Sequence, residues 1–434
     1  MINPVIASVL ILIVLCLLKL NVLIALLLAA LSGGLIAGMG FTTTMSTLVG
    51  GMGGNAETAL SYILLGALAT AISKTGAANR LARSLSESMK DMKTMLVFLI
   101  AVIACFSQNL IPVHIAFIPI LIPPLLGVMN DLKIDRRGVA CALTFGLKAP
   151  YVMLPVGFGW IFHDIITSAI VDNGMNIEFG MVWKSMLLPG IGMIIGLFIA
   201  IFISYRKPRE YESIGIEELS TTKDVENSSI TKGEIGALIG AVVAMVVQIA
   251  TESMPLGILA GLIVMWLLGA FKFNEIDNLM NSGIGMMGFI AFVMLVASGY
   301  GAVIRETGGV ETLVEGAAGL MAGSKLIAAF LMLLIGLVIT LGIGTSFGTI
   351  PIIAAIYVPL AMTLGFSPAA TIALVGTAGA LGDAGSPASD STLGPTAGLN
   401  VDGQHDHIRD TVIPTFLHYN IPLIIFGTIA ALVL

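Results

Sequence analysis

Long apolar runs constrain the fold of this chain most, because they recur at the length needed to cross a lipid bilayer. Of the 434 residues, 57% are hydrophobic and 11% are charged, and the mean hydropathy is +1.02. About 20 consecutive apolar residues span the hydrocarbon core of a membrane. Such a composition excludes a soluble globular protein. The sequence therefore predicts an all-α, polytopic membrane protein that contacts lipid.

Charge and motif content narrow the functional classes. The net charge of −6 is small and resides mostly in loops, so nucleic acid is not expected as a partner. We find no nucleotide-binding P-loop in the sequence, which argues against an ATP-driven pump. The chain is expected to be no enzyme and to need no cofactor. Its three cysteines lie in apolar segments without metal-ligand spacing, which indicates core packing; they are Cys16, Cys105 and Cys141.

A constant shift of 232 residues aligns the second half of the chain with the first. It pairs Gly51 with Gly283 and Gly76 with Gly308 without a gap. Chance matching of glycines could give some of these pairs. The shared order of features favours an internal duplication instead: two apolar segments, a Gly-rich turn, a KTG or ETG tripeptide and a later interrupted apolar run. The expected units are a first repeat at 1–205, a charged cytoplasmic linker at 206–231 and a second repeat at 232–434.

Lysine and arginine gather in two stretches, 73–93 and 130–137, and the positive-inside rule places both in the cytoplasm. The segment between them, 94–129, must return to the side it entered. It is either a re-entrant hairpin or two full crossings with a tight outer turn.

With the hairpin counted as no crossing, the first repeat crosses the membrane five times and the second repeat is inverted. The expected spans are 4–20, 22–40, 55–73, 138–160, 183–205, 233–250, 255–271, 286–304, 369–395 and 411–434, with a second hairpin at 325–364. Both termini then lie outside, as do the connections 40–54 and 160–180, which include His163.

The span at 369–395 is interrupted by polar and helix-breaking residues. Asp383 and Asp390 stand among glycines, serines and Pro387 where a helix should still be running. At membrane depth, opened backbone is tolerated only where protein buries it or where it lines a cavity. These groups, with Ser386 and Ser389, therefore indicate an ion site. The alternative is a polar loop just outside the membrane.

The tip of the second hairpin carries hydroxyl groups spaced by glycines. Thr345, Ser346 and Thr349 offer neutral oxygens that suit a dehydrated Na⁺. The alternative is close helix packing through small residues. The expected Na⁺ site combines the tip with the interrupted span, at Thr345, Ser346, Asp383 and Asp390.

The first repeat has a matching interruption with different chemistry. Lys148 lies between Gly146 and Pro150 in an apolar span, where a lysine is costly unless it faces an acid, a cavity or a substrate. It could replace a cation, anchor a substrate carboxylate or carry a proton. We expect further substrate contacts from the tip of the first hairpin, at Ser107, Gln108, Asn109 and His114. A core hydrogen bond is the more common role for a lone histidine such as His114.

The steps Gly382-Asp383, Ser386-Pro387 and Ser389-Asp390, followed by Thr392, resemble the signature of the NhaC-type sodium/proton antiporter family. The HDHIR run that ends at Arg409 resembles the continuation of that signature. On residues alone, this run is expected to be a solvated cytoplasmic loop. The resemblance implies the inverted-repeat fold of the ion transporter superfamily. The tip residues and Lys148 depart from a plain antiporter, so the chain looks more like the amino-acid permease branch, for which histidine has been suggested.

The sequence thus predicts a secondary active transporter in the inner (cytoplasmic) membrane that couples Na⁺ or H⁺ to a small amino acid by alternating access. A Na⁺/H⁺ antiporter without an organic substrate is the alternative, and a channel or transport-derived sensor is a third possibility. The family resemblance also makes a homodimer a candidate assembly.

Overall fold

Helices make up the whole architecture, and no strand occurs in the part of the chain that the computed structural model describes. That part comprises residues 3–18, 20–76, 93–109, 117–156, 158–212, 231–251, 253–310, 312, 323–343 and 345–434. Within these ranges, five helices are long and apolar enough to cross a bilayer, and two bent helix pairs would raise the number to seven. The five are Phe179–Ser204, Met287–Glu306, Lys325–Ile343, Ser346–Thr363 and His407–Val433. The predicted polytopic helical class is confirmed.

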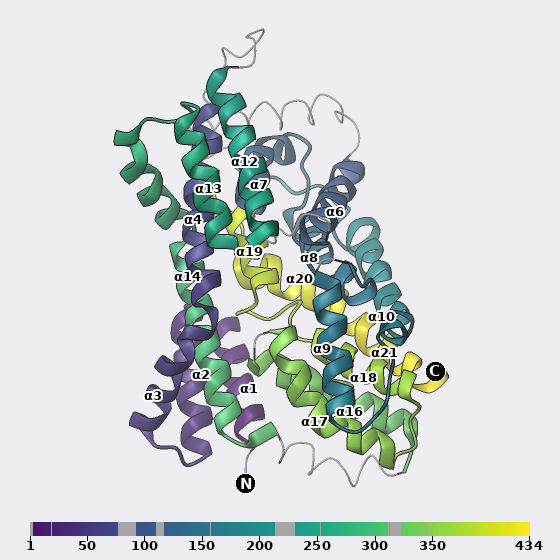
Figure 1. Ribbon diagram of the computed structural model, residues 1–434. Helices are drawn as coiled ribbons and strands as arrows, with labels where there is room; N and C mark the ends of the chain where they lie inside the picture. The colour runs from purple at the N-terminus through teal and green to yellow at the C-terminus, as the bar shows by residue number, and fades with distance from the viewer. Residues whose placement is uncertain are drawn as a thin grey trace.

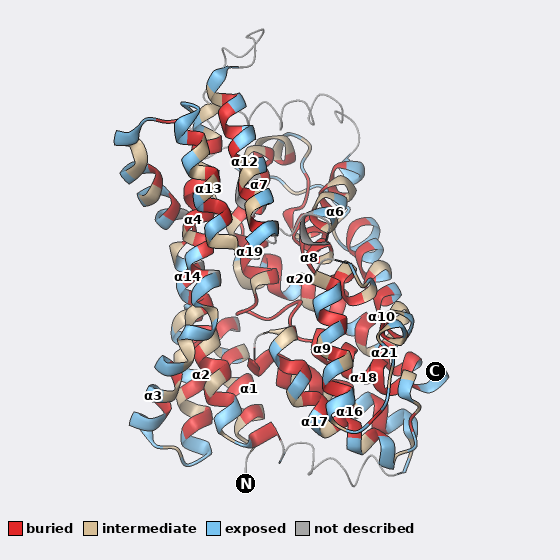
Figure 2. Ribbon diagram, in the orientation of Figure 1, coloured by how far each residue is buried: buried red, intermediate tan, exposed pale blue. Residues whose placement is uncertain are grey.

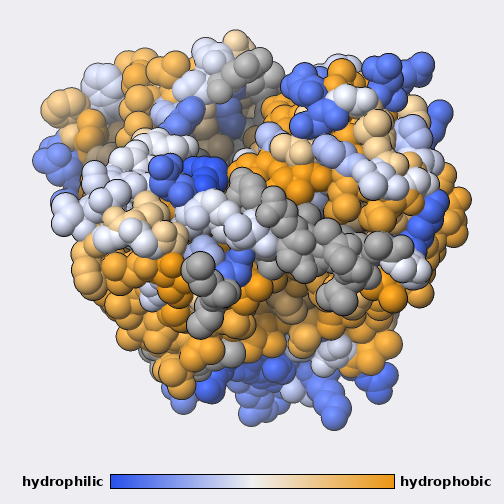
Figure 3. Space-filling view, turned by 90° about the horizontal axis from the view of Figure 1, so that it is seen from below, coloured by the Kyte–Doolittle hydropathy of each residue, from blue (hydrophilic) through white to orange (hydrophobic). Residues whose placement is uncertain are grey.

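The surface agrees with a membrane location. Large hydrophobic side chains such as Leu10, Phe198 and Val242 are more than a third exposed, which is expected where lipid replaces water. Seen from below, hydrophobic residues cover much of the rim of the molecule, while hydrophilic residues are scattered over the face (Figure 3). The flanks can therefore contact lipid tails.

One group of helices combines the first helices of both halves of the chain, on the left of Figure 1. It contains α1 (Pro4–Leu17), α2 (Val22–Ile36), α3 (Phe41–Gly51), η1 (Met52–Asn55), α4 (Ala56–Thr75), α12 (Lys232–Thr251), α13 (Met254–Leu267), η4 (Phe273–Glu275) and α14 (Ile276–Glu306). Helices α4 and α14 pack against each other along their length and form its centre. We call this group the post.

Two close contacts join α14 to the first half of the chain, one from α4 and one from the end of α3. A Cβ on Gly66 would lie 2.5 Å from the carbonyl oxygen of Gly283, so glycine lets the two backbones touch. The Ser298 hydroxyl donates to the carbonyl of Gly51 at 2.8 Å. The shift of 232 residues carries Gly51 onto Gly283 and Gly66 onto Ser298, so it exchanges the two contacts. A twofold relation between the α3–α4 segment and α14 would produce this exchange, although the inverted repeat itself stays a prediction.

The second group combines the later helices of both halves. From the first half come α6 (Lys93–Asn109), α7 (Phe117–Asp131), α8 (Arg136–Met153), α9 (Phe158–Asp172), α10 (Phe179–Ile199) and η3 (Ala200–Ser204). From the second half come α16 (Lys325–Ile343), α17 (Ser346–Thr363), α18 (Pro368–Ala380), α19 (Asp390–Leu399), η5 (His407–Val412), α20 (Ile413–Thr415), η6 (Phe416–Asn420) and α21 (Ile421–Val433). We call this group the carrier bundle. It meets the post where α14 packs against α16 and α19, where α1 packs against α16, and where α4 packs against α7.

Burial is deepest inside the carrier bundle. Helices α8 and α18 are buried over most of their lengths, and Figure 2 shows buried residues filling the middle of the molecule while α3, α12 and α13 carry exposed faces. Pro368 at the first helical position and the Ser367 side chain, which accepts from the Ala370 N–H, fix the start of α18. The core therefore surrounds Lys148 on α8 and the interrupted segment that follows α18.

The two helical hairpins, α6/α7 and α16/α17, lie toward opposite ends of the molecule (Figure 1). An inverted repeat would place them so. Helices α16 and α17 are each long and apolar enough to cross a bilayer alone. The re-entrant form of the hairpins therefore stays a prediction.

Two connections that were expected outside the membrane are helical in the structure. Residues 158–172 form α9, and together with α8 they make a helix pair bent by 48°. His163 is fully buried there, with its Nε2 atom 3.2 Å from the carbonyl oxygen of Val152. The apolar face of α9 is packed inside the protein, so the prediction that His163 lies at the outer surface is wrong, while the side of the membrane on which 160–180 lies stays a prediction. Residues 41–51, in the second connection, form the largely exposed helix α3.

Candidate functional site

The chain leaves helical geometry between α18 and α19, at residues 381–389. Gly382 and Gly385 have φ angles of 78° and 105°, which L side chains rarely adopt. A Cβ on Gly382 would lie 2.9 Å from the carbonyl oxygen of Leu337, and one on Gly385 would lie 2.6 Å from the backbone of Phe416. Glycine is required at both positions, and the helix is interrupted at the polar residues predicted from the sequence.

Side chains from other segments satisfy the opened backbone. The Asn420 side chain accepts from the N–H of Gly382 at 2.9 Å and donates to the carbonyl of Ala384 at 2.7 Å. The Thr392 hydroxyl donates to the carbonyl of Ser386 at 2.5 Å. Buried backbone groups need such partners. Asn420 was not predicted from the sequence, where its only signal is that it is a polar residue in the apolar run 411–434.

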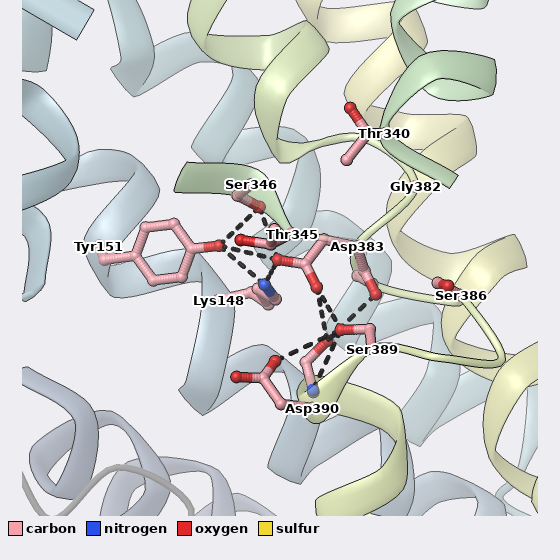
Figure 4. A network of polar contacts seen from close by, with 12 residues as sticks. Lys148, Tyr151, Thr340, Thr345, Ser346, Gly382, Asp383, Ser386, Ser389 and Asp390 are labelled. Atoms are coloured by element: carbon pink, nitrogen blue, oxygen red, sulfur yellow. Dashed lines mark hydrogen bonds and ion pairs between the residues drawn. The ribbon is translucent and has the colours of Figure 1, made fainter. Parts of the chain in front are cut away.

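Asp383 projects from this interrupted segment into a cluster of hydroxyl groups (Figure 4). Ser346, at the start of α17, donates to Oδ2 at 2.6 Å. Ser389 donates to Oδ1, and the Ser391 hydroxyl lies 3.4 Å from the same oxygen. Asp383 is only 3% exposed. The hairpin tip and the interrupted segment thus meet at one buried carboxylate.

Lys148 reaches the same carboxylate from the other half of the chain. Its Nζ atom forms an ion pair with Oδ2 of Asp383, and the lysine is 4% exposed. Helix α8 runs through Gly146 and Pro150 and ends at Met153. The prediction of an interruption around Lys148 is therefore wrong, because one missing N–H at a proline does not end a helix whose surroundings compensate. Lys148 projects from a continuous helix, and the bend follows it.

Tyr151, which was not predicted from the sequence, completes the cluster. The Lys148 ammonium donates to its hydroxyl oxygen at 2.9 Å, and that oxygen lies 3.1 Å from Oγ of Ser346. The tyrosine ring packs edge-on against Phe162, at 4.9 Å between centroids, and against Phe347 at 5.4 Å. Its signal in the sequence is its spacing: a residue three positions after Lys148 shares the same helical face.

The environment of the two charges is unequal. The carboxylate of Asp383 accepts hydroxyl hydrogen bonds at both oxygens, whereas the ammonium of Lys148 has one described hydroxyl acceptor besides Asp383. A buried ion pair gains little net stability because both ions lose water, but removing one partner strands the other at a cost of about 3–5 kcal/mol. Lys148 can therefore leave Asp383 only if another cation or a proton takes its place.

Other residues of the predicted ion site lie at the edge of the cluster. Asp390 begins α19 and is half-buried, with Oδ1 3.4 Å from the Ser389 hydroxyl. Thr345 precedes α17 beside Ser346 (Figure 4). The Thr349 hydroxyl instead donates to the carbonyl of Thr345 at 2.6 Å.

Ser386 also turns away from Asp383, in the view of Figure 4, and its hydroxyl oxygen accepts from the N–H of Ala388 at 3.2 Å. The predicted substrate contacts at the first hairpin are a separate matter. Residues 107–109 end α6, but their side chains lie outside the described part of the chain, as does His114 entirely. Their roles stay predictions.

A second polar cluster follows α19. His407 has Nε2 2.9 Å from the carbonyl oxygen of Pro387 and Nδ1 2.8 Å from the Thr396 hydroxyl. The Thr411 hydroxyl lies 2.9 Å from that of Thr396 and 2.7 Å from Nε2 of His405. His405 is buried. The prediction of a solvated loop is therefore wrong for His405, because hydroxyl groups of α19 and η5 draw the histidines inward.

Arg136 holds the far end of α19. Its buried guanidinium donates to both carboxylate oxygens of Asp402, at 2.7 and 2.6 Å, and to the carbonyl of Leu399 at 2.9 Å. Burial alone would raise the pKa of Asp402, but the hydrogen bonds and charge of Arg136 hold that pKa below its ordinary value. Bidentate pairs of this kind fix geometry. Helix α19 is thus fastened at its start by the Asp383 cluster and at its end by α8.

These features define a class: a membrane transport protein with a buried charge pair beside an interrupted helix. Comparison with known proteins then gives the family. Residues 142–428 match the Na⁺/H⁺ antiporter family, and residues 3–89 match a second family described as a Na⁺-H⁺ antiporter family. The chain belongs to the Na⁺/H⁺ antiporter family, which confirms the resemblance found in the sequence.

Full-length relatives exist in several bacteria. Two are named only as uncharacterized membrane proteins: one from Vibrio parahaemolyticus, 52% identical over 100% of both chains, and one from Haemophilus influenzae, 52% identical over 100% of this chain and 99% of the other. A third, from Bacillus subtilis, is 49% identical over 100% of both chains and is named "Putative amino acid transporter YuiF".

Among solved structures, the chain is similar to two transport proteins. The YdaH transporter of Alcanivorax borkumensis is 17% identical, with a TM-score of 0.42 over 89% of this chain and 86% of the other. MtrF of Neisseria gonorrhoeae, described as illustrating a class of antimetabolite efflux pumps, is 17% identical, with a TM-score of 0.41 over 100% of this chain and 96% of the other.

Proposed function

We propose that this chain is a cation-coupled secondary transporter in which Na⁺ or H⁺ competes with Lys148 for Asp383. The observation that carries the proposal is the buried ion pair between these two residues, which joins the two halves of the chain. Because Oδ2 of Asp383 already pairs with the ammonium, a coupling cation must displace Lys148 or protonate the carboxylate. The chain thereby has two states of one site, occupied by its own lysine or by an external cation.

The surroundings of Asp383 suit a monovalent cation. One carboxylate and the neutral oxygens of Ser346 and Ser389 give the ligand set a charge of −1, so Na⁺ replaces the ammonium without a change of charge. Neutral oxygens and opened backbone at a helix break are the usual surroundings of Na⁺ in transporters. The Tyr151 hydroxyl, 2.9 Å from the ammonium, can keep Lys148 hydrogen-bonded after displacement.

We propose a small amino acid as the organic substrate. A displaced Lys148 ammonium can bind a substrate carboxylate, so that cation binding at Asp383 would prepare the site for the organic solute. The name of the relative from Bacillus subtilis supports an amino acid, and histidine is one candidate. The family name supports the second candidate function, Na⁺/H⁺ exchange without organic cargo.

The remaining features of the proposal follow from the sequence. We place the chain in the cytoplasmic membrane with both termini outside, its lysine-rich loops inside, and two inverted repeats related across α4 and α14. Besides the coupling ion, transport is expected to need no cofactor, and the functional unit is a monomer or a homodimer.

The test uses purified protein in liposomes, loaded with buffer and supplied in turn with each labelled proteinogenic amino acid under an inward Na⁺ or pH gradient. We expect uptake of at least one amino acid to depend on the cation gradient, and Lys148→Ala to abolish it. Lys184→Ala changes an exposed lysine on α10 and is the matched control that should transport normally. Full uptake by Lys148→Ala would contradict the proposal.

A second measurement separates the two candidate functions. A pH-sensitive dye inside the same liposomes reports proton movement when Na⁺ is added without any amino acid. A pH change that Asp383→Asn abolishes would favour exchange without organic cargo. Amino-acid uptake without such a change favours the coupled transporter.

A further inference from the structure

A cavity of about 600 Å³ lies between the post and the carrier bundle, apart from the Lys148–Asp383 pair. On the post side its walls include Asn21, Gly285 and Phe289, and on the carrier side Thr396, Asn400 and His407. Small-molecule sites in proteins typically occupy roughly 300–1,000 Å³ and combine apolar walls with a few polar groups. The cavity has the size and lining of such a site.

Charged and polar groups of the cavity suit a zwitterion. Asp406 and Arg409 line it from η5 and its approach, and both are exposed, so they offer one charge of each sign at the mouth. Thr396 and Asn400 stand at the C-terminal end of α19. A helix C-terminus carries partial negative charge and attracts an ammonium group. Phe289 supplies apolar surface opposite these groups.

We propose that this cavity is a second binding site for a free amino acid, at the mouth of the transport pathway on the side of the lysine- and arginine-rich loops. The inference rests on the proposed function and deepens it, because it places the organic solute at a site other than Lys148. The mouth of the cavity lies on that side because arginines of the basic stretches contact residues beside the cavity. Arg209 donates at 2.7 Å to Asp410, which follows the lining residue Arg409, and Arg136 binds Asp402.

His407 connects the cavity to the interrupted segment. A carbonyl oxygen only accepts, so the Nε2 atom, 2.9 Å from the Pro387 carbonyl, carries a hydrogen. In the neutral ring, Nδ1 then accepts from the Thr396 hydroxyl at 2.8 Å. A solute that hydrogen-bonds to Thr396 or His407 would therefore disturb the hydrogen bond to the Pro387 carbonyl, two residues before Ser389. Since Ser389 binds Asp383, His407 is a positioning residue between the solute and the cation site.

Gly285 allows a direct test, because a Cβ added there has no described atom within 4 Å and would point into open space. The Gly285→Cys variant is made in a background with Cys16, Cys105 and Cys141 replaced by alanine. In purified protein, the rate at which N-ethylmaleimide labels the introduced thiol is measured with each proteinogenic amino acid at millimolar concentration. Gly50→Cys on the exposed helix α3, which also has open space at its Cβ, is the matched control.

We expect at least one amino acid to slow labelling of the Gly285→Cys variant several-fold and to leave the Gly50→Cys variant unaffected. In liposomes, Gly285→Leu should reduce uptake of the same amino acid at least tenfold while Gly50→Leu transports normally. The Na⁺-dependent rise in unfolding temperature, which reports the Asp383 site, should persist in Gly285→Leu.

The positioning role of His407 has its own readout. In the Gly285→Cys background, added Na⁺ should change the amino-acid concentration that gives half-maximal protection, and His407→Leu should remove this Na⁺ effect. Persistence of the Na⁺ effect in His407→Leu would overturn the positioning role.

The outcomes distinguish this inference from the proposed function. If wild-type protein takes up an amino acid in a cation-dependent way and no amino acid protects the Gly285→Cys thiol, the cavity site is overturned and the proposed function stands. If an amino acid protects that thiol without any cation-coupled uptake, the cavity site stands and the proposed function falls. If neither protection nor uptake occurs, both are overturned.

Discussion

The Lys148–Asp383 pair makes a prediction whose size can be worked from the contacts. Asp383→Asn preserves the shape of the side chain and removes its charge. The Lys148 ammonium then keeps the Tyr151 hydroxyl as its described acceptor, in a site where the lysine is 4% exposed. Stranding a buried charge costs about 3–5 kcal/mol. We expect Asp383→Asn to lower the free energy of unfolding by about 4 kcal/mol.

The reverse substitution should cost less. In Lys148→Met the carboxylate of Asp383 keeps its hydrogen bonds from Ser346 and Ser389, so we expect about 3 kcal/mol, the lower end of the range for a broken buried pair. The double variant strands neither charge and should lie within about 1 kcal/mol of the wild-type protein, because well-packed neutral groups can replace a buried pair at little cost.

Thermal unfolding of the purified protein in detergent measures these differences. With an average unfolding entropy of roughly 2 cal/mol/K per residue, a loss of 4 kcal/mol in a chain of 434 residues lowers the unfolding temperature by about 4 °C. The double variant should recover most of that fall. If the effects of the two single variants instead add within about 0.5 kcal/mol, the charges do not interact and the reasoning is refuted.

Three further predictions concern the same cluster. Na⁺ should raise the unfolding temperature of Lys148→Met more than that of the wild-type protein, because no ammonium competes for Asp383. At 100 times its Kd, the ion adds about 2.7 kcal/mol to the free energy of unfolding. An equal shift in both proteins would argue against competition. Tyr151→Phe should reduce cation-coupled uptake several-fold, because the displaced ammonium loses its hydroxyl acceptor. The control variant Tyr357→Phe loses a hydrogen bond to the Met332 carbonyl and should transport normally in the same assay. Equal effects of the two substitutions would indicate that Tyr151 has a structural role only. Asn420→Ala should lower stability by about 2–5 kcal/mol, because it leaves two buried backbone groups unpaired, and thermal unfolding with no loss would show that the interrupted segment finds other partners.

Residue chemistry within one segment was enough to predict the helix break. The glycines at 382 and 385 have backbone angles that other residues rarely adopt, and their concentration beside Asp383 and Pro387 is visible in the sequence. The sequence also indicated that Lys148 must face an acid, a cavity or a substrate, because an intramembrane charge needs a partner. The structure brings Lys148 and Asp383 together, while their roles in transport stay predictions.

Contacts between distant segments could not be predicted in the same way. Asn420 and Tyr151 complete the site from η6 and α8. Nothing in the neighbourhood of Asn420 distinguishes it from other polar residues of apolar helices, and the spacing of Tyr151 from Lys148 places it on one helical face without showing which distant groups it meets. Hydroxyl directions were equally hidden: Ser346 faces Asp383, but the Thr349 hydroxyl, one turn later, bonds to its own helix. Pro150 and the charges near 160–180 were misleading local signals, because tertiary burial of α8 and α9 outweighs them.

The mutual neutralisation of Lys148 and Asp383 has an electrical consequence. Moving a single charge across a membrane changes its free energy by about 2.3 kcal/mol for every 100 mV of membrane potential. A lysine and an aspartate that move together carry no net charge through this field. The resting carrier should therefore reorient at a rate that an imposed voltage hardly changes. In the proposed cycle, a cation displaces the ammonium from the carboxylate and leaves one positive charge unbalanced at this site, so we expect voltage to drive the reorientation of the loaded protein.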